Sequence, residues 1–215
     1  TPSTHAASSS DLEPRPSVMS VGHLNTRTET NHAPDGPLSP WISDNGDGSY
    51  RNPVLFADYS DPDAIRVGEE YWMTASSFCH VPGLPVLRSR DLVNWELVNH
   101  ALRRLVPEEH YSVPRAGCGV WAPALRFHNN RFWIFFPDPD FGLYVVSTDD
   151  PTGKWTEPHL LKKGKGLIDP CPLWDDKGNA WLVHGWARSR AGINNPVSMS
   201  SGAITNWGSI FISVL

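Results

Sequence analysis

The stretch DPDAIRVGEEYWMTAS, residues 61–76, has a layout that returns twice further along the chain. A small or acidic residue and a proline are followed by an apolar pair, a polar turn and an aromatic-rich segment. The same order occurs in APALRFHNNRFWIFF (122–136) and DPCPLWDDKGNAWLVHG (169–185). Gly and Asn tolerate positive φ angles, so each polar turn predicts a tight β-hairpin. The turn pairs are Gly68-Glu69, Asn129-Asn130 and Lys177-Gly178.

A second layout alternates with the first. GLPVLRSRDLVNWELV (83–98) and FGLYVVSTDDPTGKWTEPHLL (141–161) both run from an apolar strand through a Ser-x-Asp turn to a tryptophan. Four short strands in each repeat of about 50 residues are typical of β-propeller blades. A β-sandwich also has many short strands, but it does not have this doubled repeat. The predicted fold class is therefore all-β, of the propeller type.

Composition and charge exclude several classes of partner. The net charge is −5 and no Lys/Arg cluster occurs, so we expect neither nucleic acid nor an anionic membrane as a partner. No apolar run approaches the ~20 residues that span a bilayer. The nine histidines form no HxH or HExxH pattern, so no metal site is expected. Ten tryptophans suit both a sheet core and a site that stacks on sugar rings.

The three cysteines, Cys79, Cys118 and Cys171, are odd in number and widely spaced. They indicate neither a disulfide framework nor a CxxC zinc site, and they leave open one bridge whose partners the pattern does not name. Residues 1–45 are rich in Ser, Thr, Pro, Asn and His and have no periodicity. Such a segment cannot bury enough apolar surface to offset its ordering entropy, so we predict a disordered leader or linker there.

Two aspartates occupy corresponding places in the repeats. Asp61 and Asp169 each precede a proline and the inner strand of a predicted blade, where equivalent positions converge on the axis. Glycoside hydrolysis uses such paired carboxyl groups. Alternatively, each Asp-Pro begins a strand and its carboxylate caps backbone N–H groups. Trp121, at the matching place in the second repeat, is a candidate floor for a sugar site or a core residue.

Another acidic turn, with Asp138 and Asp140, is interpreted as a loop that connects blades.

Four segments in this order resemble glycoside hydrolase family 43. The resemblance runs from Tyr50 to Asn195 and implies a five-bladed propeller acting as a β-xylosidase or α-L-arabinofuranosidase; a related fructan-acting family is a minor alternative. The segments are NPVLFADYSDPDAIRVGEEYWMTASSF, LPVLRSRDLVNWELV, GVWAPALRFHNNRFWIFF and LIDPCPLWDDKGNAWLVHG.

The resemblance also implies roles for particular residues. Asp61 matches the family's general base, and Asp169 matches the carboxylate that orients the general acid and tunes its pKa. Phe78 and Trp121 match aromatic residues that line the sugar site. The implied mechanism is inverting, with acid and base ~6.5–9.5 Å apart to admit a water. The implied protein is secreted, although no signal peptide is visible; it acts on xylo- or arabino-oligosaccharides without a cofactor, and a central structural ion stays open.

The general acid is the part of the pattern that this chain does not match. In the family it is a glutamate one blade beyond the second aspartate, but the last glutamate here is Glu157, and only Asp175 and Asp176 follow Asp169 as acids. We therefore expect about three of five blades over residues 46–195, with impaired activity. The alternative is a non-catalytic carbohydrate-binding fragment.

The final segment, residues 196–215, is expected to lie outside the family. Its preferred interpretation is a translated intron, and an ordinary fourth strand is the alternative.

Overall fold

A computed structural model of the chain describes residues 41–191 and 211–214. The predicted leader over residues 1–45 therefore falls mainly outside the described residues. So does the predicted tail over residues 196–215, of which only 211–214 are described. Within residues 41–45, Asp44 forms a β-bridge with Tyr50, and the ring of Trp41 stacks on Phe56 with centroids 5.4 Å apart.

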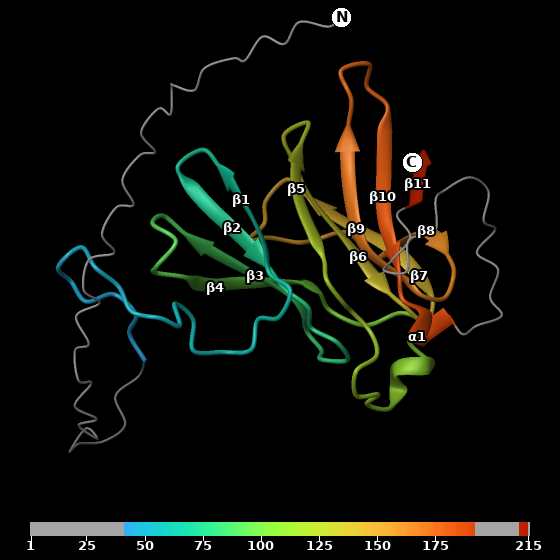
Figure 1. Ribbon diagram of the computed structural model, residues 1–215, viewed down its shortest axis with the longest axis horizontal. Coiled ribbons are helices and arrows are strands. Elements are labelled where there is room, and N and C mark those ends of the chain that lie inside the picture. Colours follow the sequence, from blue (N-terminus) through green and yellow to red (C-terminus); the bar gives the residue numbers. More distant parts are fainter. Residues whose placement is uncertain (1–40, 192–210, 215) are drawn as a thin grey trace, which may run out of the picture. The chain divides into compact units, whose positions relative to one another are not determined.

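The described residues form three antiparallel sheets, which confirms the all-β fold class (Figure 1). The first sheet has the order β1-β2-β3-β4, and its strands are Asp63–Val67, Glu70–Thr74, Gly83–Ser89 and Glu96–Leu102. The second has the order β5-β6-β7-β8, with strands Ala124–His128, Arg131–Asp138, Gly142–Thr148 and His159–Lys163. The third has the order β11-β10-β9, with strands Phe211–Val214, Ala180–Trp186 and Leu167–Trp174.

Helical structure in the described part of the chain is confined to two short elements. These are a 3₁₀ turn, η1 (His110–Ser112), and a single helical turn, α1 (Arg188–Ala191). No helix found there is long and apolar enough to cross a membrane.

The structure confirms the hairpins and the alternating repeat. The β1–β2, β5–β6 and β9–β10 turns fall at the predicted places, and Asn129 and Asn130 both have positive φ angles of 52° and 57°. The two Ser-x-Asp segments also fold alike. Asp91 Oδ1 accepts hydrogen bonds from the backbone of Val93 and Asn94. In the second segment Asp150, one residue beyond Ser147-Thr148-Asp149, takes this role, and its Oδ1 accepts a hydrogen bond from the backbone of Thr152. The first and second sheets therefore repeat the same local chemistry.

The three sheets are joined through their first strands. β5 packs between β1 and β9, and the second sheet also packs its β6 against β9 (Figure 1). Trp72 of the first sheet meets Phe132 of the second edge-on, with ring centroids 5.4 Å apart, inside one buried apolar cluster. Over the described residues the sheets do not close into a ring.

An ion pair ties β1 to β5. Asp63 Oδ2 accepts hydrogen bonds from Arg126 Nη1 at 2.6 Å and from the backbone N–H of Leu125 at 2.8 Å. Both charged side chains are about two-thirds buried, with relative exposures of 32% and 30%. Arg126 Nη2 also lies 3.5 Å from the sulfur of Cys171 on β9. One guanidinium group therefore contacts the first strand of each neighbouring sheet.

We predict that Asp63→Ala lowers the free energy of unfolding by roughly 2–3 kcal/mol, because it leaves a largely buried guanidinium and a backbone donor without their acceptor. Urea unfolding of the purified chain measures the effect. The matched control is Asp149→Ala, which removes an ion pair with Arg131 at 2.8 Å in which the carboxylate is 73% exposed. That change should cost less than about 1 kcal/mol. Equal losses in the two variants would contradict the prediction.

Candidate active site

Asp61 lies in the loop that enters β1, two residues before Asp63. Its φ angle is +49°, a left-handed conformation that is uncommon outside glycine. The loop is fixed by a hydrogen bond from the backbone N–H of Ser76 to the carbonyl of Ser60 at 2.9 Å. The Ser76 hydroxyl then donates to Asp61 Oδ2 at 2.8 Å. Asp61 is exposed at this position, so one oxygen is held by the protein and the residue remains open to solvent.

Asp169 lies at an irregularity in β9. Cys171 pairs with Val183, and Ile168 pairs with Gly185. Asp169 and Pro170 on β9 therefore both lie opposite one residue of β10, His184. This is the arrangement of a β-bulge, which Pro170 favours because it has no N–H for the ladder. Asp169 takes a φ angle of +52° there. A Cβ added at Gly185 would lie 3.4 Å from Asp169 Oδ2, so the missing side chain leaves room for the carboxylate.

The two aspartates come together in the structure. Partial burial raises the pKa of Asp169, and the nearby negative charge of Asp61 raises it further. Although Asp169 as a residue is exposed, its carboxyl group is therefore partly desolvated and lies within electrostatic range of the Asp61 carboxylate. Two carboxyl groups from separate repeats thus share one electrostatic environment, which is the setting that general acid–base chemistry uses.

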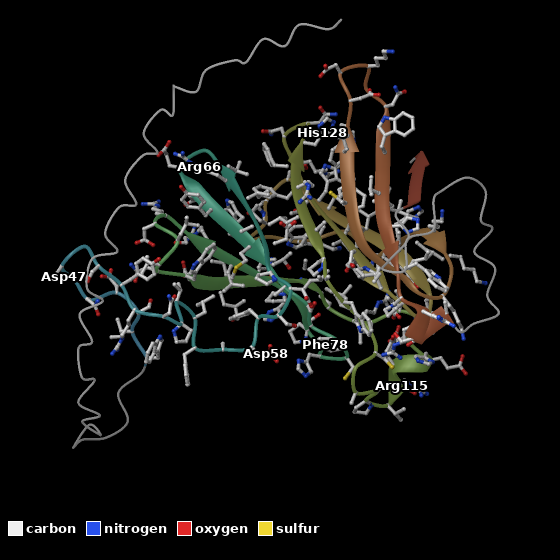
Figure 2. The ribbon with its side chains drawn as sticks, in the orientation of Figure 1. Asp47, Asp58, Arg66, Phe78, Arg115 and His128 are labelled. Carbon is white, nitrogen blue, oxygen red and sulfur yellow. The ribbon has the colours of Figure 1, made fainter. Side chains whose placement is uncertain are left out.

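Phe78 and Trp121 are placed by a contact between the first two sheets. Phe78 lies in the β2–β3 loop (Figure 2) and forms a β-bridge with Val120, with N···O distances of 2.8 and 3.0 Å. The backbones approach so closely that a Cβ at Gly119 would lie 2.2 Å from the Phe78 carbonyl oxygen. Gly119 also has a φ angle of +90°, so only glycine fits there without strain. The bridge brings the predicted aromatic pair into neighbouring loops.

The Trp121 indole is held in place by its surroundings. Its Nε1–H donates to the carbonyl of Gly117 at 3.0 Å, and its backbone N–H donates to the carbonyl of Pro137 at 3.1 Å. The guanidinium carbon of Arg190 lies 5.0 Å from the ring centroid. The residue is half-buried. Trp121 is therefore a loop residue with one face covered and not part of the apolar core.

The acidic turn with Asp138 and Asp140 joins β6 to β7 within the second sheet, so its interpretation as a loop that connects blades is wrong. Asp138 is buried, accepts a hydrogen bond from the Tyr111 hydroxyl, and accepts another from the backbone N–H of Asp140 at 3.0 Å. Asp175, in the β9–β10 turn, accepts bonds from the backbone of Lys177 and Asn179. Hydrogen bonds from the Asn179 side-chain amide and from the Trp181 indole N–H, followed by those from the backbone, lower the pKa of Asp175 to about 2, so Asp175 is not a proton donor near neutral pH.

Sequence reasoning missed the residues that support the site. Ser76 and Gly185 fix the two aspartates, and Arg190 covers Trp121. All three belong to segments that the repeat or the family resemblance includes, but no local pattern connects them with their partners. Their partners lie 15 or more residues away in sequence, and only the folded chain brings them together.

The described residues include no group of three or more His, Cys, Asp or Glu side chains that could hold a metal ion. All three cysteines are free thiols, so this structure contains no disulfide bridge between them.

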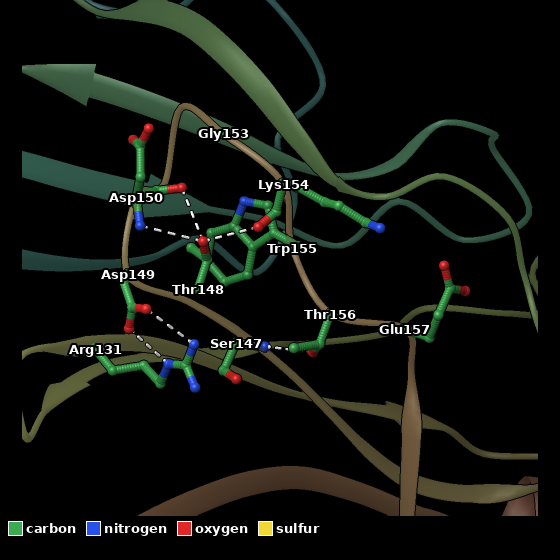
Figure 3. A pocket seen from close by; sticks show the side chains of 10 residues that line it. All are labelled: Arg131, Ser147, Thr148, Asp149, Asp150, Gly153, Lys154, Trp155, Thr156 and Glu157. Carbon is green, nitrogen blue, oxygen red and sulfur yellow. Dashed lines mark hydrogen bonds and ion pairs between the residues drawn. The ribbon is translucent and has the colours of Figure 1, made fainter.

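A separate pocket of about 570 Å³ lies beside the β7–β8 connection (Figure 3). Several of its charged and polar groups are already paired within the chain. Arg131 bonds Asp149, and the Thr148 hydroxyl lies 2.9 Å from the carbonyl oxygens of Asp150 and Lys154. None of the predicted site residues lines this pocket, so we do not assign the site to it.

The buried carboxyl group of Asp138 predicts a pH dependence of stability. Burial raises its pKa from 3.8 to about 6, so the folded chain holds this proton more tightly than the unfolded chain. The stabilisation is fully present below pH 3.8 and is lost as the pH rises through about 6, and it amounts to roughly 3 kcal/mol. Asp138→Asn should remove this component, since the Tyr111 hydroxyl can accept from the new amide. Urea unfolding between pH 4 and about pH 7.5 checks the difference. Parallel pH profiles for the two chains would contradict it.

Comparisons with known proteins identify the family of this chain. The model of glycosyl hydrolases family 43 matches residues 50–203. A putative beta-xylosidase of Xylanibacter ruminicola is 43% identical over 140 residues, covering 65% of this chain and 26% of that protein. A xylosidase/arabinosidase 43B of Humicola insolens is 35% identical over 142 residues, covering 62% and 26%.

A solved structure is also similar to this chain. The crystal structure of a xylan beta-1,4-xylosidase from Bacillus halodurans C-125 has a TM-score of 0.53 at 31% identity, covering 66% of this chain and 28% of that chain. The chain spans about a quarter of the length of the curated relatives it matches. Because the family model covers well over half of the residues, this chain belongs to glycosyl hydrolases family 43.

Proposed function

We propose that this chain is part of the catalytic domain of an inverting glycosidase that acts on xylosidic or arabinosidic bonds of plant cell-wall polysaccharide. The observation that carries the proposal is the meeting of Asp61 and Asp169, whose carboxyl groups come from separate repeats and interact electrostatically. The names of the matched relatives, a beta-xylosidase and a xylosidase/arabinosidase, support the class of substrate.

In this proposal the two aspartates have different roles. Asp61, exposed and oriented by Ser76, is the general base that takes a proton from the attacking water. Asp169, partly desolvated, orients the general acid and tunes its pKa. Phe78 and Trp121 supply apolar ring surface against which the CH-rich face of a sugar packs. The reaction uses no cofactor, and a central ion would have a structural role only.

We further propose that the three sheets are three blades of a five-bladed propeller, and that the protein is secreted. The repeat of four antiparallel strands in β1–β4 and β5–β8 supports the blade assignment. The family's acid is a glutamate beyond Asp169, and no glutamate follows Glu157 in these 215 residues. The proposal therefore assigns low turnover to this chain alone on natural glycosides, since a missing general acid costs roughly 10²–10⁴-fold.

The test uses two substrates that differ in their need for an acid. A 2,4-dinitrophenyl xyloside or arabinofuranoside has a leaving group that departs without protonation, whereas xylobiose needs a general acid. We expect the chain to hydrolyse an activated glycoside with inversion at the anomeric carbon, followed by NMR, and to leave xylobiose almost untouched. Asp61→Asn should lower turnover of the activated substrate by roughly 10²–10⁴-fold.

The matched control is Asp58→Asn, which changes an exposed carboxylate in the same loop (Figure 2) and should leave turnover unchanged. Equal turnover by the parent chain and Asp61→Asn would contradict the role of Asp61. Binding of xylobiose without turnover of any activated glycoside would favour the carbohydrate-binding fragment instead.

A further inference from the structure

Arg190 reaches from the third sheet to the loop that carries Trp121. It lies in α1, which follows β10, and its guanidinium carbon is 5.0 Å from the Trp121 ring centroid. Its Nη2 donates a hydrogen bond to the carbonyl of Gly117, and its Nη1 lies 3.5 Å from the sulfur of Cys118. One side chain therefore contacts three residues of a single loop in the preceding repeat.

The Gly117 carbonyl links the indole to the guanidinium. It accepts a hydrogen bond from Trp121 Nε1 at 3.0 Å and another from Arg190 Nη2. Gly117 has a φ angle of +71°, a conformation that L side chains rarely adopt. Two donors on one acceptor, together with the contact between guanidinium and ring, restrict the tilt of the indole relative to the guanidinium.

The position of α1 is also constrained by the fold. The backbone N–H of Ala187 donates to the carbonyl of Gly166 at 2.6 Å. A Cβ at Gly166 would lie 2.7 Å from the Cβ of Ala191, so this close approach requires glycine. The turn that carries Arg190 is thus packed directly against Gly166, at the start of β9. Gly166 precedes Ile168 by two residues and Asp169 by three.

The charge of Arg190 is balanced by the turn after β6. Its Nη1 lies 3.3 Å from Asp140 Oδ2, and both side chains are about three-quarters buried. The backbone N–H of Asp140 is itself bonded to the buried carboxylate of Asp138. The guanidinium is therefore held between a fixed carboxylate and the indole, and its planar surface is directed by both.

We propose that Arg190 is the positioning residue for the sugar-binding face of Trp121. It covers one face of the indole and fixes the ring through the shared Gly117 carbonyl, so that the opposite face is presented to a xylose or arabinose ring at a constant angle. The inference rests on the proposed function, in which Trp121 lines the sugar site. It adds a residue that touches no substrate and acts only through the indole.

The test separates the position of the ring from sugar binding. The difference between near-UV circular dichroism spectra of the parent chain and Trp121→Phe isolates the Trp121 signal. Arg190→Gln should remove most of this signal and weaken xylobiose binding by roughly 3- to 10-fold, measured by calorimetry. Combined with Trp121→Phe, it should weaken binding no further than Trp121→Phe alone.

Two further variants keep the result interpretable if Arg190→Gln destabilises the chain. Arg190→Lys keeps the positive charge near Asp140 but lacks the planar fork, so it should also reduce the Trp121 signal. Arg188→Gln removes an exposed arginine of the same helical turn and should change neither the signal nor binding.

Three outcomes would overturn the inference. The role of Arg190 fails if the parent chain binds xylobiose while Arg190→Gln and Arg190→Lys keep both the Trp121 signal and the affinity. It fails likewise if the effects of Arg190→Gln and Trp121→Phe simply add. If the parent chain binds neither xylobiose nor arabinobiose, the proposed function itself fails, and the spectra then report only a structural contact.

Discussion

The ion pair between Asp63 and Arg126 is the interaction on which the rest of the structure depends. It joins the first strand of one sheet to the first strand of the next, and the same guanidinium lies against Cys171 in the third. Asp61 lies two residues before Asp63, and Asp169 lies two residues before Cys171. The contacts that fix β1, β5 and β9 relative to one another therefore also determine the distance between the two carboxyl groups of the site.

Local backbone strain occurs at the predicted site residues. Three of the four predicted site residues, Asp61, Phe78 and Asp169, have positive φ angles, which side chains other than glycine adopt at a cost of about 1–3 kcal/mol each. Such conformations persist only where surrounding contacts determine them. Here those contacts are the Ser76 hydroxyl, the bridge to Val120 and the bulge in β9. The strain is an observed property of these residues, and it agrees with a site that is shaped before a ligand arrives.

Much of the fold was predictable because it depends on short-range sequence patterns. The hairpin turns at Asn129-Asn130 and the Ser-x-Asp segments depend on residues a few positions apart, so the sequence alone predicted their place. The correspondence of Asp61 and Asp169 followed from the repeat. In contrast, the ion pair of Asp63 was not predictable, because its partner Arg126 is 63 residues away and no local pattern links them. Arg190 was missed for the same reason, since Trp121 and Gly117 lie about seventy residues before it.

The absence of a side chain at Gly119 has a consequence for how the repeats behave together. In repeat architectures, stability is approximately the sum of each repeat's own stability and the interface between neighbours. Gly119 lies outside the strands, in the connection before β5, yet it allows the backbone of one repeat to lie directly on the backbone of the next. Gly119 therefore contributes to the interface between the two repeats, and not to the stability of either repeat alone. This glycine helps the first two sheets to unfold as one cooperative unit instead of two independent ones.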